Sequence, residues 1–190
     1  MNVYRLYSNC KNEYRSLKMV VGNVGEFLRR FDGTPMKRPW TDVLIGWDPE
    51  TNRFPKGDYP HLVLSLPVFS SRAVDALGDL LEGNGEILPT TCEGEQIFFF
   101  NATKVIDALD ESNSEVIRYH GSTEVMRVET CAFFKEKLTG AVIFKIPQFP
   151  VGPVFVTDPF VERVKSTGLK GFWFPRVWST DETATIDWVW

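Results

Sequence analysis

The sequence predicts an α+β fold, a single domain over residues 1–190 with a mainly antiparallel sheet and two principal helices packed on it. Two patterns support this prediction. Short apolar runs separated by turn residues are typical of antiparallel strands, and a strand, a helix cap and an amphipathic helix follow one another twice. The chain has 190 residues, of which 43% are hydrophobic and 14% aromatic, so it can bury a core of its own.

The first third of the chain predicts one strand, one short helix and a long irregular segment. Val3–Leu6 alternates apolar and polar residues, which indicates a strand. Apolar residues recur every three or four positions from Asn23 to Phe31 and predict a short amphipathic helix closed by the turn Asp32–Gly33. The many prolines and glycines of Thr34–Pro60 indicate an irregular segment. Its two tryptophans and its aliphatic residues indicate that it is packed rather than disordered.

The middle of the chain contains the clearest strand and helix. The apolar run His61–Phe69 predicts a strand, and Ser70 and Ser71 follow it as N-cap candidates, because their hydroxyls can accept hydrogen bonds from free N–H groups. Apolar residues at helical spacing between positions 73 and 81 then form one stripe. Gly83–Gly85 should end this helix, since glycine and asparagine tolerate the left-handed cap conformation.

The same order of elements returns near the C-terminus. Val154–Val156 predicts a strand, Thr157–Pro159 a helix cap and first turn, and residues 160–164 an apolar helix stripe. Gly168 is a natural helix terminator, and Gly171–Phe174 predicts a last strand. The two copies are short, so we interpret the repetition as the same local physical chemistry rather than as a duplicated domain.

Further strands are expected between the two helices. Runs rich in β-branched and aromatic residues predict them at residues 86–88, 96–100, 125–128, 131–134 and 142–146. Residues 103–109 leave two interpretations open, because their spacing suits a helix face and their β-branched residues suit an extended chain.

The charge balance and the cysteines restrict the class of protein. The chain carries 21 Lys and Arg against 25 Asp and Glu, a net charge of -4, and lacks the positive excess that a general nucleic-acid binder needs. Cys10, Cys92 and Cys131 lie far apart and are odd in number, which predicts free thiols. The N-terminal residues hold no apolar signal region, and no later run approaches the length of a membrane span. We therefore expect a cytoplasmic protein that binds neither nucleic acid nor a membrane.

The sequence contains no recognisable catalytic, cofactor or metal motif. The two histidines, His61 and His120, stand beside an apolar run and a turn, and no nucleophile elbow surrounds any serine. The glycine pairs lack the other residues of phosphate-binding loops, and no Cys or His pair has the spacing of metal ligands. We therefore predict no catalytic site, no cofactor and no metal.

Two alternative functions remain open at the level of sequence. Paired carboxylates can perform acid and base chemistry when one of them is buried, and the sequence offers Glu93, Glu95, Asp107 and Asp110. An enzyme of this kind predicts a concave pocket with a buried carboxyl group. A small-ligand-binding module instead predicts an apolar cavity lined by phenylalanines.

Tryptophans beside acidic residues are the most distinctive candidates for a binding surface, because aromatic anchors with a charged surround are favoured at protein interfaces. The candidate partner-binding residues are Trp47, Asp48, Glu50, Trp178, Asp181 and Glu182. The C-terminal stretch Trp188–Trp190 must either pack on the domain or meet a partner, since two exposed indoles are unfavourable.

Several short blocks, in their order and spacing, resemble one protein family. They are Arg30–Gly33 followed by Trp40, Pro67–Leu77, Gly85–Pro89, Phe100–Asn101, Val105–Asp110, Ile143–Pro147, Phe155–Thr157 and Gly168–Phe172. In these blocks the chain resembles a bacterial family of polymorphic-toxin immunity proteins, the eleventh of the numbered Imm families and formerly a domain of unknown function.

The resemblance implies a protein that binds and neutralises a cognate toxin encoded near it, and it carries over no catalytic residues. It leaves the oligomeric state open, and residues 179–190 lie outside its pattern. If the toxin is a basic nuclease, the acidic excess of this chain would speed their association.

Overall fold

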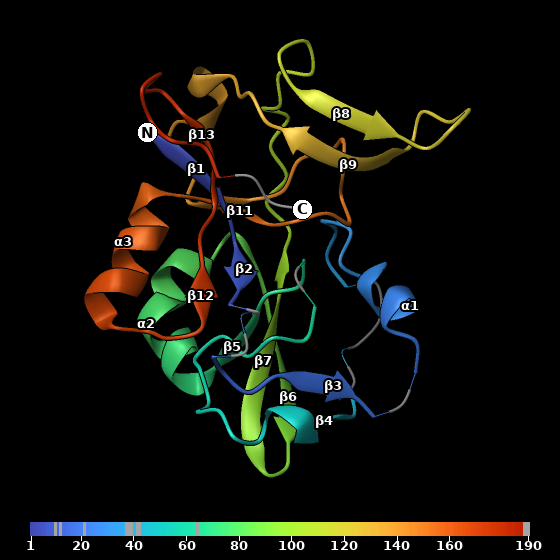
Figure 1. The fold of residues 1–190 in the computed structure, drawn as a ribbon, viewed down its shortest axis with the longest axis vertical. Coiled ribbons are helices and arrows are strands. Elements are labelled where there is room, and N and C mark those ends of the chain that lie inside the picture. The colour runs from blue at the N-terminus through green and yellow to red at the C-terminus, as the bar shows by residue number, and fades with distance from the viewer. Residues whose placement is uncertain are drawn as a thin grey trace.

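The computed structural model describes residues 1–9, 11, 13–20, 22–36, 40, 43–63 and 65–187. Within these residues, thirteen short strands pair antiparallel in five small sheets beside three α-helices (Figure 1). The predicted α+β class with two principal helices is confirmed, although several small sheets take the place of one continuous sheet.

The elements have the following bounds. The helices are α1 (Val24–Leu28), α2 (Ser71–Leu81) and α3 (Asp158–Thr167), with the 3₁₀ turns η1 (Pro49–Thr51) and η2 (Lys135–Leu138). The first strands are β1 (Asn2–Arg5), β2 (Tyr7–Ser8), β3 (Leu17–Met19), β4 (Ile45–Trp47), β5 (Val68–Ser70) and β6 (Gly85–Cys92). The later strands are β7 (Glu95–Ala102), β8 (Glu115–Arg118), β9 (Val125–Thr130), β10 (Ile143–Phe144), β11 (Phe155–Thr157), β12 (Phe172–Trp173) and β13 (Arg176–Ser179). No helix within the described ranges is both long and apolar enough to span a membrane.

Two sheets have more than two strands. The four-stranded sheet has the order β10-β11-β1-β13, so the N-terminal strand lies between two strands from the end of the chain. The three-stranded sheet has the order β5-β7-β6. Its β6–β7 hairpin pairs Gly85 with Ala102 at one end and Cys92 with Glu95 at the turn. The four-stranded sheet therefore joins the two ends of the chain, whereas the three-stranded sheet comes from one stretch, residues 68–102.

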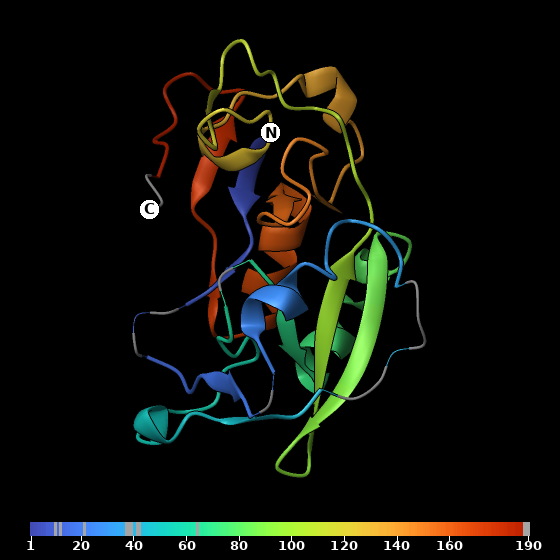
Figure 2. The same ribbon diagram turned by 90° about the vertical axis from the view of Figure 1, so that its right-hand side faces the viewer.

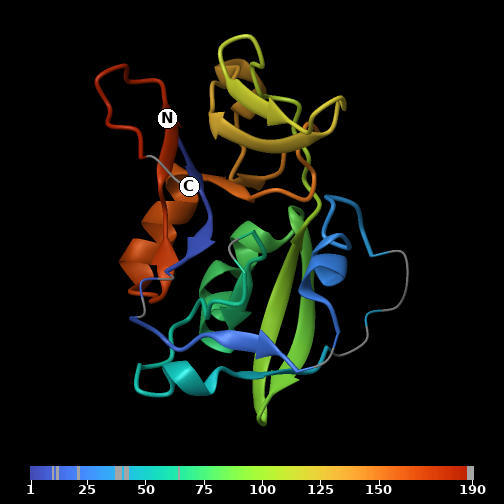
Figure 3. The same ribbon diagram turned by 45° about the vertical axis from the view of Figure 1, so that its right-hand side comes forward.

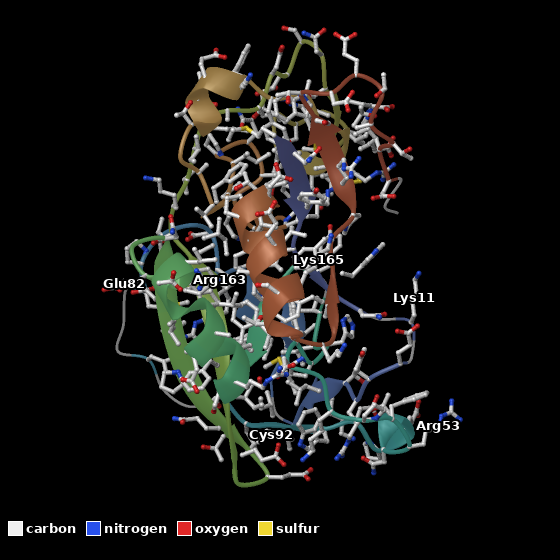
Figure 4. The ribbon with its side chains drawn as sticks, turned by 90° about the vertical axis from the view of Figure 1, so that its left-hand side faces the viewer. Lys11, Arg53, Glu82, Cys92, Arg163 and Lys165 are labelled. Carbon is white, nitrogen blue, oxygen red and sulfur yellow. The ribbon has the colours of Figure 1, made fainter. Side chains whose placement is uncertain are left out.

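Helices α2 and α3 begin and end where the sequence predicts. Ser70 Oγ accepts a hydrogen bond from the Ala73 N–H at 3.2 Å, and Gly168 ends α3 with a φ of 66°. The helices lie side by side, and Figure 4 shows Arg163 on α3 next to α2. Its guanidinium donates to both carboxylate oxygens of Asp79 on α2, at 2.6 and 3.0 Å. The two similar strand–cap–helix segments thus pack against each other.

The N-terminal predictions hold with shorter bounds. β1 covers Asn2–Arg5, and α1 is a five-residue helix inside the predicted range 23–31. Asn23 caps α1, because its Oδ1 accepts from the N–H groups of Gly25 and Glu26. The described residues of 34–60, namely 34–36, 40 and 43–60, are irregular apart from β4 and η1, as the glycines and prolines of this segment indicate.

Two strand predictions need correction. His61–Phe69 contributes only its last two residues to β5, since a turn closes at Leu66. Residues 131–134 form no strand, and Phe133 makes one isolated bridge with Leu109. Leu66 and Phe133 are buried, so the apolar residues correctly mark the core. A strand also needs a neighbouring strand to pair with, and burial does not supply one. Neither segment therefore forms a strand over its predicted length.

Other segments differ from the sequence patterns in smaller ways. Residues 103–109 are neither helix nor strand and contain isolated bridges at Val105 and Leu109. The predicted strands at 96–100 and 125–128 are confirmed, whereas the run 142–146 shortens to the two residues of β10. β8 and β13 had no clear sequence signal, and they find partners in β9 and β1.

Two hydrophobic clusters fill the interior. The larger one combines buried side chains of α1, α2, α3 and the β5–β7 sheet, including Phe27, Leu77 and Phe99. The smaller one lies near β8, β9, β13 and η2 in the upper part of Figure 3 and includes Phe133. Cys92 and Cys131 are free, as predicted, and both are buried, one in each cluster, whereas the third cysteine lies outside the described residues.

Candidate functional site

The loop Phe31–Met36 is held in place by buried polar side chains from distant parts of the chain. Lys145 follows β10 and is 2% exposed. Its Nζ donates to the carbonyl oxygens of Phe31 at 2.6 Å, Pro150 at 2.7 Å and Gly152 at 3.3 Å. One ammonium group therefore joins the loop to the segment that precedes β11.

The surroundings of Lys145 give it a structural role. Burial lowers the pKa of Lys145 to about 8, and the negative charge of Asp32 opposes this shift. The three carbonyl oxygens match the three N–H donors of an ammonium group. A buried amine that donates all of its hydrogen bonds to backbone carbonyls stabilises the fold and is not accessible to a substrate.

Asn101 on β7 holds the same loop from the other side. Its side chain is fully buried, and its Nδ2 donates to the Thr34 carbonyl at 2.9 Å and to Glu86 Oε2 at 2.8 Å. The same carboxylate oxygen of Glu86 accepts from the Met36 N–H at 3.0 Å. These bonds tie residues 34–36 to the β6–β7 hairpin.

The contacts around this loop explain the spacing of the short sequence blocks. Gly33 has a φ of +85°, and a Cβ there would lie 2.8 Å from Cγ2 of Val105. The blocks that meet here are Arg30–Gly33, Gly85–Pro89, Phe100–Asn101, Val105–Asp110 and Ile143–Pro147. Because the buried side chains of Lys145 and Asn101 tie these segments together, the blocks build a scaffold around the loop.

A second polar junction fixes the start of α2. Asp58 is 9% exposed and accepts from Ser70 Oγ at 3.0 Å and from the Arg72 guanidinium at 2.8 Å. It also accepts from the backbone N–H of Lys170, beyond α3, at 2.8 Å. Nothing in the local sequence separates Asp58 from an ordinary surface carboxylate, so sequence reasoning missed it.

The histidines do not form a catalytic arrangement with any described residue. His61 Nδ1 and Ser8 Oγ lie 2.7 Å apart, and burial lowers the pKa of His61, which keeps the ring neutral at neutral pH. Ser8 is fully buried in β2, so its hydroxyl cannot attack a substrate in this conformation. The contact joins β2 to the segment before β5. His120 lies exposed at a turn.

The four carboxylates of the enzyme hypothesis are dispersed. Glu93, Glu95 and Asp107 are exposed, and Asp110 is half-buried. Glu93 and Glu95 lie at the turn of the β6–β7 hairpin, whereas the other two lie beyond the opposite end of β7. Glu95 forms an ion pair with Lys56. These positions therefore do not meet in one pocket.

Two of the surface hollows have distinct linings. One of about 190 Å³ is bounded by Met1, residues 140–142 and residues 157–159, and one of about 480 Å³ lies between β3 and the start of α1. The ligand-binding alternative requires a cavity lined by phenylalanines. Neither of these two hollows has a phenylalanine in its lining. Among the described residues, no group of three or more His, Cys, Asp or Glu side chains could hold a metal ion.

The first group of predicted contact residues is mostly built into the fold. Trp47 is 4% exposed in the larger core, and the cations of Arg15 and Lys56 lie 4.8 and 5.2 Å from its ring centroid. Asp48 caps η1, where its Oδ1 accepts from the Glu50 N–H at 3.1 Å. Within this group, Glu50 alone is exposed.

The second group lies at the surface near the other end of the molecule, on and after β13 (Figure 1). Trp178 is half-buried, and its ring packs edge to face on Phe133 with 5.9 Å between centroids. Asp181 and Glu182 are exposed. Hydrogen bonds from the Thr183 hydroxyl at 2.7 Å and backbone N–H at 3.0 Å lower the pKa of the Asp181 carboxyl.

The loop that follows β13, residues 180–187, is closed on itself. The Arg176 N–H donates to Asp187 Oδ2 at 2.7 Å, and the Asp187 N–H donates to the Arg176 carbonyl at 2.8 Å. The Thr180 N–H donates to the Met1 carbonyl at 3.0 Å. Sequence reasoning missed this closure, because it depends on contacts with β13 and the N-terminus. The two alternatives for Trp188–Trp190, packing on the domain or meeting a partner, concern residues outside the described part of the chain.

Comparison with known proteins identifies one family. Residues 87–179, from β6 to β13, match the immunity protein family Imm11, which confirms the family resemblance of the sequence blocks in this range. The search of curated proteins finds no match to the chain. The matched range contains Asn101, Lys145 and Trp178, whereas the loop Phe31–Met36 that the first two hold lies before it.

Proposed function

We propose, on the premise that residues 87–179 match the immunity protein family Imm11, that this protein binds and neutralises a cognate bacterial toxin. The family match is the observation that carries the proposal. The protein would act as one domain in the cytoplasm of the cell that makes it. It would act by steric and electrostatic complementarity and not as an enzyme.

The loop after β13 is the first candidate for the contact surface. Trp178 is half-buried, and the exposed acidic residues Asp181 and Glu182 follow it three and four positions later. Partly exposed tryptophans often carry a large share of the energy of protein interfaces. The internal hydrogen bonds of the loop favour binding, because a pre-formed loop loses little conformational entropy. A basic surface of the toxin would complement it.

The other predicted contact residues divide into one contact candidate and two residues that stabilise the fold. Glu50 is exposed and remains a candidate for a peripheral contact. Trp47 and Asp48 support the fold around η1, so we propose that they act on binding only through that support.

Co-expression tests the proposal. Bacteria would express the toxin encoded beside the gene for this chain, with and without the chain, and their growth would be compared. We expect the chain to restore growth and to elute with the toxin as one complex in gel filtration. Growth arrest that the chain does not relieve would contradict the proposal.

A matched pair of variants tests the contact surface. Glu182→Lys reverses a charge beside Trp178, whereas Glu162→Lys makes the same change at an exposed position of α3. We expect the first variant to weaken the complex and the second to leave it unchanged. Equal affinities would place the contact elsewhere. Raising the salt concentration should also slow association of the wild-type pair.

A further inference from the structure

We propose that a groove beside β3 is a second contact surface, which holds an apolar segment of the toxin that also carries carboxylates. This inference rests on the proposed function. The groove has a volume of about 480 Å³ and lies between β3, the start of α1 and the segment before β5. Leu17, Met19, Val24 and Leu62 supply its apolar lining, and Lys18 supplies a positive charge. Figure 2 faces the side of the molecule that carries α1 and β3.

The edge of the groove exposes aliphatic side chains, and exposing apolar surface to water is unfavourable. Leu44 is 58% exposed, Val20 is 54% exposed and Val24 is 42% exposed. The Val20 N–H donates to the Leu44 carbonyl at 3.0 Å, which keeps these two residues adjacent. Single exposed aliphatic residues are normal, but a patch beside a hollow is typical of a surface that a protein partner covers.

The charge that lines the groove indicates the chemistry of this partner. Lys18 forms no ion pair within 4.0 Å with any residue that the structure describes. The sequence around it is basic, since residues 1–60 contain ten Lys and Arg against seven Asp and Glu. Residues 61–190 contain eleven against eighteen. The groove therefore suits a segment that combines aliphatic side chains with carboxylates.

The position of the groove in the sequence supports a role in partner choice. Its residues lie before the range 87–179 that matches the immunity protein family. A shared scaffold cannot by itself distinguish one toxin from another, so specificity requires surfaces that differ between members. The basic groove and the acidic loop after β13 would together select a partner with both charges correctly placed.

Charge and size variants of exposed residues test the groove. Leu44→Asp and Lys18→Glu should each weaken binding of the purified toxin about ten-fold or more, because they place a negative charge against the acidic segment. Lys18→Arg should retain wild-type affinity. Met126→Asp on β9 is the matched control, since it adds the same charge at an exposed apolar residue far from the groove. Calorimetric titration gives the affinities, and thermal melts confirm that each variant is folded.

Hydrogen exchange of the wild-type complex supplies a measurement that needs no variant. Toxin binding should slow exchange of backbone amides in residues 17–24. Wild-type affinity in Leu44→Asp and Lys18→Glu, together with unchanged exchange there, would overturn the groove proposal while the proposed function stands. A loss of self-association in place of toxin affinity would assign the groove to a second copy of the chain and overturn the proposal as well. A wild-type chain that binds no toxin would instead contradict the proposed function, and the groove proposal with it.

Discussion

Two stretches of this chain, Trp47–Glu50 and Trp178–Glu182, share a tryptophan followed by acidic residues, and the fold uses them differently. Trp47 is 4% exposed in the larger core, and the acid next to it caps a 3₁₀ turn. Trp178 is half-buried on an edge strand, and its acidic neighbours lie in an exposed loop. The same local composition therefore forms part of the core in one place and of the proposed contact surface in the other.

The difference between the two stretches comes from what lies around them. β4 pairs with β3 at the larger core, and Arg15 and Lys56 cover the Trp47 ring. β13 is an edge strand of its sheet, and residues 180–187 after it fold back as a loop. Tryptophan beside acid indicates a protein interface only where tertiary packing leaves the ring partly uncovered.

The largest effect that separates the two stretches should be on stability. Trp47→Ala should lower the free energy of unfolding by about 3–5 kcal/mol, because it leaves a cavity in the core. Trp178→Ala should cost about 1–2 kcal/mol, since its side chain is only partly buried. Urea denaturation measures both values. Equal losses in the two variants would contradict the assignment of Trp47 to the core and Trp178 to the surface.

Binding should reverse the order of the two tryptophans. Trp178→Ala should weaken the complex with the toxin about ten-fold or more, because partly exposed tryptophans are frequent binding anchors. Trp47→Phe, which keeps an aromatic ring in the core, should bind with nearly wild-type affinity. Calorimetric titration checks this prediction. A folded Trp178→Ala variant with unchanged affinity would remove the loop after β13 from the contact surface.

The acidic residues of the first stretch should differ from each other. Asp48→Ala removes the side-chain acceptor that caps η1 and should cost about 1 kcal/mol of stability. Glu50→Ala changes an exposed side chain and should alter stability by less than about 0.5 kcal/mol. Denaturation midpoints of the two variants test the difference. A larger loss for Glu50→Ala would show that the cap does not stabilise this turn.

The smallest effect should be a dependence of stability on pH in the second stretch. Thr183 hydrogen bonds lower the pKa of Asp181 below its ordinary value of 3.8, so folding favours the charged carboxylate. The resulting stabilisation is fully present above pH 3.8 and is lost as the pH falls through the lower pKa of the folded state. The stability difference between wild type and Asp181→Asn should therefore shrink on acidification below that value. A difference that is constant with pH would contradict the hydrogen-bonded loop.

Local features of the fold could be predicted well from the sequence. The helix α2 follows from the Ser70 cap and the apolar stripe, and α3 ends at Gly168 as expected. These features depend on residues within a few positions of one another. The length of β5 and the absence of a strand at 131–134 depend on distant partners, which a single sequence does not reveal.

The polar interior and the groove show the same limit. Lys145 and Asn101 look like ordinary surface residues in the sequence, yet each is buried against carbonyl oxygens from distant segments. The lining of the groove comes from β3, α1 and the segment before β5, which tertiary contacts bring together. Residue types alone could indicate an aromatic and acidic surface, but could not distinguish the buried Trp47 from the half-buried Trp178.

An activity titration tests the central claim most directly. A fixed amount of toxin would be mixed with increasing amounts of the chain, and the remaining toxin activity would be measured. Neutralisation by binding predicts a linear loss of activity that is complete at a fixed stoichiometric ratio, with intact toxin recovered after the complex is dissociated. Complete loss of activity at far smaller amounts of the chain, with chemically altered toxin, would instead show catalysis and contradict the account.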